Sequence, residues 1–389
     1  MIRTILIIAL IFSIYIANGQ SINVGLFHKF NVKTLVFKPL KGSFFLENED
    51  GYKEKIKSND VIYITLVGDK ISVWGLEKHL GLSESIAITP KKDQALFSLE
   101  PAFPALPKRR YEGSLQILIH PDDKLTIVNA VEFEKYVASV VEAESGVRAT
   151  HEFYKSQATI SRTYALNHID RHLNENFNVC DDVHCQVYKG IQTQNSRIKQ
   201  AVDATRGLVI TDKNNQLITA AFHSNSGGYT ISSEDVWSAA MPYLRGKQDP
   251  YWDNQHNSHW TATIELDDWI AFIEEMGIKL PPNYNTKELF AFQQPSRARN
   301  MVIANQMVPL KQVRNHFKLR STFFSIEPQG NQLLVKGRGY GHGVGLSQEG
   351  AMKMARMGKN FEDIIHFYYH DVQLLNIDST TYLLRLLSQ

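Results

Sequence analysis

The most informative stretch of this sequence is Gly337-Arg-Gly-Tyr-Gly-His-Gly-Val-Gly-Leu-Ser-Gln-Glu-Gly-Ala351, which has glycine at every second position from Gly337 to Gly345. It differs from the dinucleotide-binding fingerprint, which needs two residues between its second and third glycines, and from the phosphate-binding loop, which needs a following Gly-Lys-Ser/Thr. Glycines at this density clear side chains from one face of the backbone, so that a flat ligand or another segment can approach. His342 within it is either a ligand-binding residue or a packed histidine in a glycine-rich bend.

A polar loop upstream has a related composition. It reads Phe222-His-Ser-Asn-Ser-Gly-Gly-Tyr-Thr230. Small hydroxyl and amide side chains beside paired glycines suit a loop that touches a polar ligand, and they equally suit a tight turn. The candidate binding residues of the two segments are His223, Ser224, Ser226, Gly227, Gly228, Gly341, His342, Gly343, Ser347 and Gln348.

One carboxylate, Glu144, ends an apolar run that begins at Tyr136, and Ser145-Gly146 follow it. A carboxyl group half buried by apolar neighbours has a raised pKa and can act as a general acid. In a solvated turn the same residue is only a surface acid. The residues alone leave both interpretations open.

A helix is predicted to follow, from Thr150 as its N-cap to about Leu173. Gln157 and Arg162 lie inside this mostly apolar segment. A buried arginine needs a carboxylate or a bound ligand to offset its charge. Arg162 therefore takes part either in a structural ion pair or in a binding site.

The sequence has two cysteines, Cys180 and Cys185, and His184 directly precedes the second. Thiolate and imidazole are zinc ligands, and a fourth ligand is available upstream, where His168 and His172 are spaced to share one helix face. A disulfide between the cysteines is the alternative, which an exported location favours. The adjacent histidine favours a metal, and we expect a structural site.

Residues 1–19 have the pattern of a secretory signal. Arg3 precedes an apolar run that ends in Ala17-Asn-Gly19, and the run is shorter than the roughly 20 residues that span a bilayer. An uncleaved anchor is the alternative. No later segment is long and apolar enough to span a membrane, so we expect an exported protein of the periplasm or cell envelope.

The 389 residues carry 42 Lys+Arg against 40 Asp+Glu, and 43% are hydrophobic. This composition is typical of a folded globular protein, and its near-neutral charge gives no reason to expect nucleic acid as a partner. Strand patterns fill residues 20–135, and helices are predicted at 264–277 and after caps at Ser347 and Asn360. We therefore expect an α+β fold rich in strands, and no nucleotide cofactor.

Taken in order, these segments resemble the SpoIID/LytB family, the stage II sporulation protein D group of peptidoglycan enzymes and amidase enhancers. The resemblance spans roughly residues 22–375. It departs after Glu144, where the family often has Met-Pro and this chain has Ser145-Gly146. The matching pieces are Val140-Val-x-x-Glu144, Glu152-x-x-Lys155-x-Gln157-Ala-x-x-x-Arg162-Thr-Tyr-Ala165, Ala204-Thr-Arg-Gly207, His223–Gly228, Tyr243-Leu-Arg245 and Gly341–Ala351.

The resemblance implies a SpoIID-like domain with a β-rich subregion at 20–135 and a catalytic region at 136–389. It also implies lytic transglycosylase activity on the glycan strands of peptidoglycan. Glu144 would be the acid and base, Arg162 and Gln157 would orient groups or stabilise charge, and Tyr164 would contact substrate. The polar loop and the glycine-rich segment would line the glycan groove.

The resemblance also bears on the metal and on partners. Family members often carry a zinc site of two cysteines and two histidines, which Cys180, His184 and Cys185 match, with His172 as the expected fourth ligand. Some relatives activate a separate amidase, so a non-catalytic wall-binding enhancer of a cell-wall amidase is the alternative function. Metal-dependent hydrolysis at the Cys/His site is a third interpretation.

Overall fold

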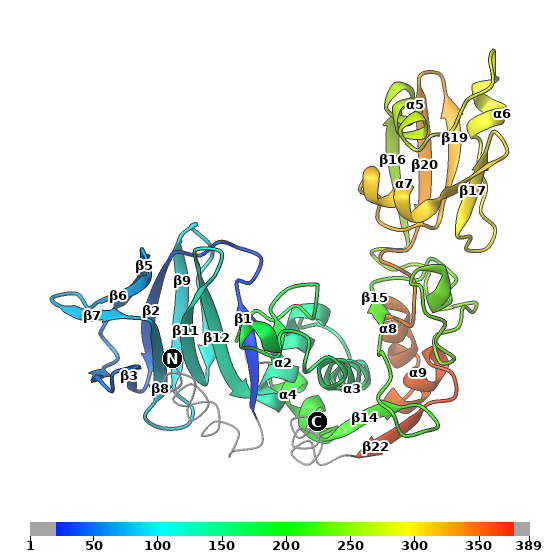
Figure 1. The fold of residues 1–389 in the computed structure, drawn as a ribbon. Helices are drawn as coiled ribbons and strands as arrows, with labels where there is room; N and C mark the ends of the chain where they lie inside the picture. The colour runs from blue at the N-terminus through cyan, green and yellow to red at the C-terminus, as the bar shows by residue number, and fades with distance from the viewer. Residues whose placement is uncertain (1–20, 194, 377–389) are drawn as a thin grey trace. The chain divides into compact units, whose positions relative to one another are not determined.

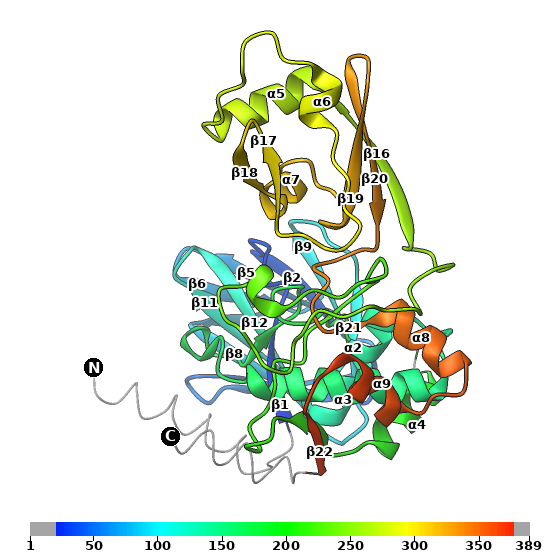
Figure 2. The same ribbon diagram turned by 90° about the vertical axis from the view of Figure 1, so that its right-hand side faces the viewer.

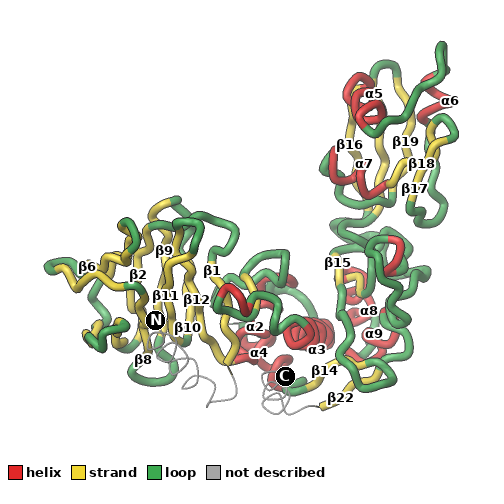
Figure 3. The backbone as a smooth tube through the Cα atoms, in the orientation of Figure 1, coloured by secondary structure: helices red, strands yellow, loops and turns green. Residues whose placement is uncertain are grey.

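The computed structural model describes residues 21–193 and 195–376, so the predicted signal lies outside the described residues. The chain divides into two units: unit 1 runs to Ile210 and resumes at Leu374, and unit 2 is Thr211–Gln373. Helices and strands occur in both (Figure 3), which confirms the predicted α+β class. Among the described residues, no helix is long and apolar enough to cross a bilayer.

Unit 1 begins with two sheets that pack face to face (Figure 1, blue to cyan). Phe44 of one sheet contacts Phe37 and Phe97 of the other, with ring centroids 5.4 and 5.7 Å apart. Alternating burial along the strands places apolar side chains between the sheets. In spatial order the first sheet is β13 (Val179–Cys180), β1 (Ser21–Leu26), β12 (Lys124–Glu132), β11 (Ser114–His120), β8 (Ser85–Pro90), β3 (Phe44–Asn48) and β4 (Lys53–Ile56). The second is β10 (Arg109–Glu112), β9 (Leu96–Phe103), β2 (Thr34–Lys41), β5 (Ile62–Val67), β6 (Lys70–Trp74) and β7 (His79–Ser83).

A helical part of unit 1 follows β12 without a loop. Its elements are α2 (Phe133–Ser145), α3 (His151–Asn167), the 3-10 helix η1 (Leu173–Glu175), α4 (Ser196–Ala204), β14 (Leu208–Thr211) and β22 (Gln373–Asn376), which pairs with β14. The helix α2 contacts β1 and β12 as well as α3 and α4. The division between the units falls after Ile210, so this helical part belongs with the sheets of unit 1.

Unit 2 contains an apolar core built on a three-stranded antiparallel sheet (Figure 2). Trp269 is fully buried there and contacts Phe290 and Phe317, with ring centroids 6.2 and 5.6 Å away. The elements around this core are β16 (His259–Glu265), β20 (Gln332–Arg338), β19 (Phe324–Gln329), α5 (Leu266–Glu275), α6 (Thr286–Phe290), α7 (Leu310–His316) and the hairpin β17 (Asn300–Ile303) and β18 (Gln306–Pro309).

The rest of unit 2 carries the polar loop and the glycine-rich segment. These two segments run side by side because β15 pairs in parallel with β21, and Asn225 bridges to Tyr340. The elements are β15 (Phe222–His223), the 3-10 helix η2 (Ser233–Asp235), β21 (Leu346–Ser347), α8 (Gln348–Arg356) and α9 (Phe361–Tyr368).

N-cap residues in the sequence correctly predicted where three helices begin. The side chains of Thr150, Ser347 and Asn360 each accept a hydrogen bond from the backbone N–H three residues later, at 3.4, 3.3 and 2.7 Å. The helix after Thr150 ends at Asn167 rather than near Leu173. The helix α2 was not predicted at all.

Candidate functional site

Glu144 lies in the last turn of α2. Along this helix Tyr136, Val137, Val140 and Val141 recur at helical spacing and are fully buried, which fixes α2 within unit 1. Glu144 follows this apolar face and is half buried. The surroundings that the sequence suggested for this acid are therefore present.

The carboxylate of Glu144 is held by the segment that follows the cysteines. The backbone N–H of Val187 donates a hydrogen bond to its Oε1 at 3.0 Å. Burial raises the pKa of Glu144 above that of an ordinary glutamate and outweighs the Val187 hydrogen bond and the charge of Lys189, which lower it. A half-buried acid that retains its proton is suited to protonate a leaving group.

Arg162 is fully buried and paired with Glu134. Its Nε and Nη2 donate to the two carboxylate oxygens of Glu134 at 2.9 and 2.7 Å, and its Nη1 donates to the carbonyl of Leu208 at 2.8 Å. The guanidinium thus joins α2, α3 and β14. Of the two alternatives for this arginine, the structure shows the carboxylate partner, and the side chain is 0% exposed.

Gln157 and Tyr164 of the same helix α3 have different surroundings. Gln157 is fully buried, and its Nε2 donates to Ser161 Oγ at 3.3 Å. Tyr164 is half exposed, and its hydroxyl donates to the carbonyl of His184 at 3.4 Å and accepts from Arg171 at 3.0 Å. Gln157 therefore belongs to the helix packing, whereas Tyr164 lies beside the cysteine loop.

The predicted metal-binding residues lie together. One possible ligand atom from each of His172, Cys180, His184 and Cys185 is within 4.8 Å of all the others, and the cysteines are free thiols. The Nε2 atom of His172 is buried without a hydrogen-bond partner among the described residues, while its Nδ1–H donates to Glu175 at 2.6 Å. Such a carboxylate fixes the tautomer that leaves Nε2 for a metal.

The donor set suits zinc, because two thiolates and two imidazoles are a common tetrahedral set for this ion. A hydrogen bond from Cys180 holds the pKa of Cys185 down, at about 6. His168, the other upstream histidine, is outside the group, and its Nδ1 bonds to the carbonyl of Tyr164 at 2.8 Å. The residues present therefore fit a structural zinc site.

The cysteine loop is anchored to the sheet beside it. Cys180 pairs in parallel with Gly25 of β1. Asp181 accepts hydrogen bonds from the backbone N–H of Phe27 at 2.9 Å and from Arg109 at 2.7 Å. The same loop then runs on to Val187, which holds Glu144, so the metal-type cluster and the acid share one short segment.

In unit 2, the glycine-rich segment is packed against the polar loop. Gly341 and Gly345 have φ angles of +109° and +70°, which side chains rarely adopt. A Cβ atom on Gly341 would lie 2.8 Å from the Cβ of His223, and one on Gly345 would lie 2.1 Å from the carbonyl oxygen of Ala221. The face that these glycines clear is thus filled by another segment of the chain, one of the two possibilities that the sequence left open.

A hydrogen-bond network joins the two segments inside unit 2. Asp249 accepts from Ser226 Oγ at 2.7 Å and from the Tyr368 hydroxyl at 3.1 Å, and Ser347 Oγ accepts from the Ser226 N–H at 3.2 Å. Burial raises the pKa of Asp249.

The predicted binding residues of unit 2 differ in exposure. Those that are buried are His223, Ser226, Gly227, Gly228, Gly343, Ser347 and Gln348, and those that are partly exposed are Ser224, Gly341 and His342.

His342 is surrounded by rings and by arginines. Its ring centroid is 5.6 Å from that of His223 and 5.5 Å from that of Trp237. Burial lowers the pKa of His342 to about 4, and the charges of Arg314 and Arg297 act in the same direction, so its imidazole is neutral at pH 7. Sequence reasoning missed both arginines because each stands outside the motifs.

These features define a two-unit α+β protein, with a half-buried acid of raised pKa and a Cys/His cluster in one unit and a histidine-bearing glycine segment in the other. The chain belongs to the stage II sporulation protein D (SpoIID) family. The model of that family, described as a stage II sporulation protein, matches residues 121–211, from the turn before β12 to the end of β14. This region contains Glu144 and the whole cysteine loop.

Three relatives show the extent of the similarity. The chain is 31% identical to stage II sporulation protein D of Bacillus subtilis over 272 residues, 65% of this chain and 77% of that protein. It is 28% identical to an uncharacterized protein of Brachyspira hyodysenteriae over 351 residues, 89% of this chain and 93% of the other. It is 27% identical to the amidase enhancer of Bacillus subtilis over 269 residues, 56% of this chain but 37% of the enhancer.

Proposed function

We propose that this protein is a lytic transglycosylase that cleaves the bond from N-acetylmuramic acid to N-acetylglucosamine in peptidoglycan. The observation that carries the proposal is the half-buried position of Glu144 in the last turn of α2, inside the family-matching region, where burial raises its pKa. Membership of the SpoIID family supports a role at the cell wall. The predicted signal at residues 1–19 agrees with a substrate outside the cytoplasm.

One carboxyl group is sufficient for this reaction. Glu144 gives its proton to the glycosidic oxygen as the C1–O bond breaks and positive charge develops at C1. The C6 hydroxyl of the same muramic acid then bonds to C1, and its proton passes to the Glu144 carboxylate. The product carries a 1,6-anhydro ring, no water is consumed, and the acid regains its starting state.

The other residues of unit 1 support this acid. The Val187 N–H orients the Glu144 carboxylate, and the Glu134–Arg162 ion pair fixes the helices on either side. Bound zinc would be held by Cys180, His184, Cys185 and His172, and it would supply structural rigidity to their loop.

The test is incubation of the purified protein with peptide-free glycan strands, followed by mass analysis for 1,6-anhydro ends. Glu144→Gln removes the proton donor and should lower turnover by about 10²–10⁴-fold while leaving glycan binding nearly intact. Glu77→Gln, at an exposed glutamate, is the matched control and should cleave normally. Equal cleavage by Glu144→Gln and the parent would refute the assignment.

A relative named amidase enhancer makes wall-binding stimulation of an amidase the second candidate function. In that case the protein would raise the activity of a cell-wall amidase without producing any 1,6-anhydro ends. The stimulation would also survive Glu144→Gln. The same product analysis, repeated with an amidase present, separates the two functions.

A further inference from the structure

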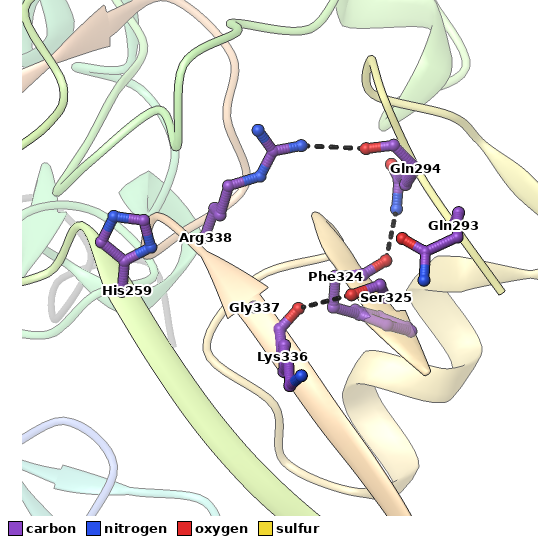
Figure 4. Close-up of a pocket in the computed structure, with 8 residues that line it drawn as sticks. All are labelled: His259, Gln293, Gln294, Phe324, Ser325, Lys336, Gly337 and Arg338. Carbon is purple, nitrogen blue, oxygen red and sulfur yellow. Dashed lines mark hydrogen bonds between the residues drawn. The ribbon is translucent and has the colours of Figure 1, made fainter. Parts of the chain in front are cut away.

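A polar hollow of about 260 Å³ lies beside the three-stranded sheet of unit 2 (Figure 4). Arg338 and Lys336 from β20 and His259 from β16 contribute to its lining, together with Gln293 and Gln294. Apart from Arg338, which follows Gly337 at the start of the glycine-rich segment, none of these residues belongs to the motifs identified in the sequence. The hollow therefore has no role in the function described so far.

Strand register explains why cationic side chains gather here. Lys336 and Arg338 are two residues apart on β20, so they lie on the same face of the sheet. His259 pairs with Arg338 across the β16–β20 ladder. On the opposite face a Cβ on Gly337 would lie 1.9 Å from the Trp260 ring, so that face is closed by the apolar core.

Arg338 has no carboxylate partner among the described residues. Its guanidinium lies 3.9 Å from the centre of the Phe323 ring, and its Nη2 donates to the carbonyl of Gln294 at 2.9 Å. Figure 4 shows this hydrogen bond at the rim of the hollow. In the described part of the chain, the Nε and Nη1 atoms make no hydrogen bond, so both can donate to a ligand.

Two more arginines behind Arg338 increase the positive charge. Arg297 lies 5.2 Å from the same Phe323 ring and donates to the backbone carbonyls of Ser226 and Tyr229, both at 2.7 Å. Neither Arg297 nor Arg314 forms an ion pair with any described residue. Burial lowers the pKa of Arg297 to about 9, and repulsion from Arg314 and Arg338 adds to this effect.

The carboxylates near the hollow do not offset this charge. Lys336 pairs with Glu327 at 2.7 Å, with both side chains about half exposed, and His259 contacts Asp253 at 3.1 Å. Each of these acids thus pairs with a side chain other than the three arginines. A guanidinium group that lacks an anion is stabilised by a carboxylate bound through parallel hydrogen bonds.

We propose that this hollow binds a carboxylate group of an acidic saccharide, with Arg338 as the principal contact and the Gln293 amide beside it. That the carboxylate is carried by a saccharide rests on the proposed function, whereas the anion-binding chemistry rests on the arginines. In peptidoglycan the carboxylate has two sources. One is the lactyl group of a peptide-free muramic acid, and the other is a stem peptide.

The test measures binding without turnover, in full-length Glu144→Gln protein, by calorimetry at low salt. Three tetrasaccharides are compared: peptide-free alternating N-acetylglucosamine and N-acetylmuramic acid, the same glycan with stem peptides, and uncharged chitotetraose. We expect at least one charged ligand to bind about tenfold more tightly than chitotetraose. We also expect Arg338→Gln and added salt to remove that advantage.

The two charged ligands identify the source of the carboxylate. Tighter binding of the peptide-free glycan alone assigns the lactyl group, and tighter binding of the peptide-bearing glycan alone assigns the stem peptide. Equal binding of all three ligands, or a charge advantage that persists in Arg338→Gln, overturns the proposal. Because no cleavage is measured, this result is independent of whether Glu144 is catalytic.

Matched variants guard against a merely structural effect. Arg299→Gln removes an exposed arginine outside the lining and should leave the charge advantage intact. Lys336→Gln, on the wall of the hollow, should reduce the binding advantage of the charged ligand about threefold. This change leaves the contacts of Arg338 with Phe323 and Gln294 in place. If Arg338→Gln fails to fold, an unchanged advantage in Lys336→Gln is sufficient to overturn the proposal.

Discussion

At the scale of single residues, the surroundings of Glu144 decide its protonation state. Burial raises its pKa, whereas the Val187 amide and the positive charge of Lys189 lower it. Of these neighbours, only Lys189 is an exposed side chain that can be replaced without opening the core. Removing the charge of Lys189 should therefore shift the pKa of Glu144 without moving the Glu144 side chain.

The proposed mechanism predicts a specific pH dependence. Glu144 must begin the reaction protonated, so kcat/KM should fall as the pH rises through its pKa, above the roughly 4.3 of an unperturbed glutamate. Lys189→Gln removes a charge that lowers this pKa, so the fall should move to higher pH. The exposed Lys213→Gln is the control and should leave the profile unchanged. A profile that is the same in all three proteins would argue against Glu144 as the acid.

Residue-level prediction from sequence worked where the determinants were local. The apolar run directly before Glu144 made a half-buried acid of raised pKa one of two open interpretations, and it is the one the structure shows. The partner of Arg162 could not be identified, because Glu134 is 28 residues away and is brought close by the packing of α2 on α3. Arg297, Arg314 and Arg338 come together from separate segments, so nothing in their sequence neighbourhoods indicated a cluster.

At the scale of elements, the cysteine loop links a metal-type cluster to the candidate acid. The loop starts on β13, carries Cys180, His184 and Cys185, and reaches the Val187 amide two residues later. Its candidate metal ligands lie close together in sequence and could be identified there, whereas its anchors Gly25, Phe27 and Arg109 are distant in sequence and could not. The helix α2 escaped prediction because Val137, Val140 and Val141 are β-branched and favour strands intrinsically, although their spacing is helical.

Metal removal should loosen this loop selectively. We expect about one zinc per chain in the purified protein and, after chelation, faster hydrogen exchange at the Val187 amide. The Ile210 amide, which donates to Thr163 Oγ1 at 2.9 Å within the helical part, should exchange at its original rate. Cys180→Ser should reproduce the effect without a chelator. A protein that contains no zinc and has a Cys180–Cys185 disulfide would contradict this expectation.

At the scale of the whole molecule, the chain has separate apolar cores in its two units. Unit 1 is stabilised by the packed sheets and by the buried Glu134–Arg162 pair, and unit 2 by the core around Trp269. The sequence predicted the strand-rich class but not this division. Residues 136–210 pack within unit 1, together with the strand-rich residues before them.

Breaking the buried ion pair should destabilise unit 1 alone. Glu134→Gln leaves the Arg162 charge buried without a counter-ion, which costs about 3–5 kcal/mol. Glu132→Gln, at an exposed pair with Arg206, should cost at most about 1 kcal/mol. Trp74 is the sole tryptophan of unit 1. In a Trp74→Phe variant, tryptophan fluorescence therefore reports the unfolding of unit 2, while calorimetry reports the unfolding of both units. If Glu134→Gln lowered the temperature of the fluorescence transition as much as that of the calorimetric transition, the two units would unfold as one.

The pairing of β14 with β22 has a consequence for how unit 2 is inserted in the chain. The boundaries of unit 2 fall within these two hydrogen-bonded strands, after Ile210 and before Leu374. A module that enters and leaves its host at one pair of strands can be excised and the gap bridged by a short linker. Unit 2, with its glycine-rich segment, could thus be exchanged between homologues without changing α2, the helix that carries Glu144.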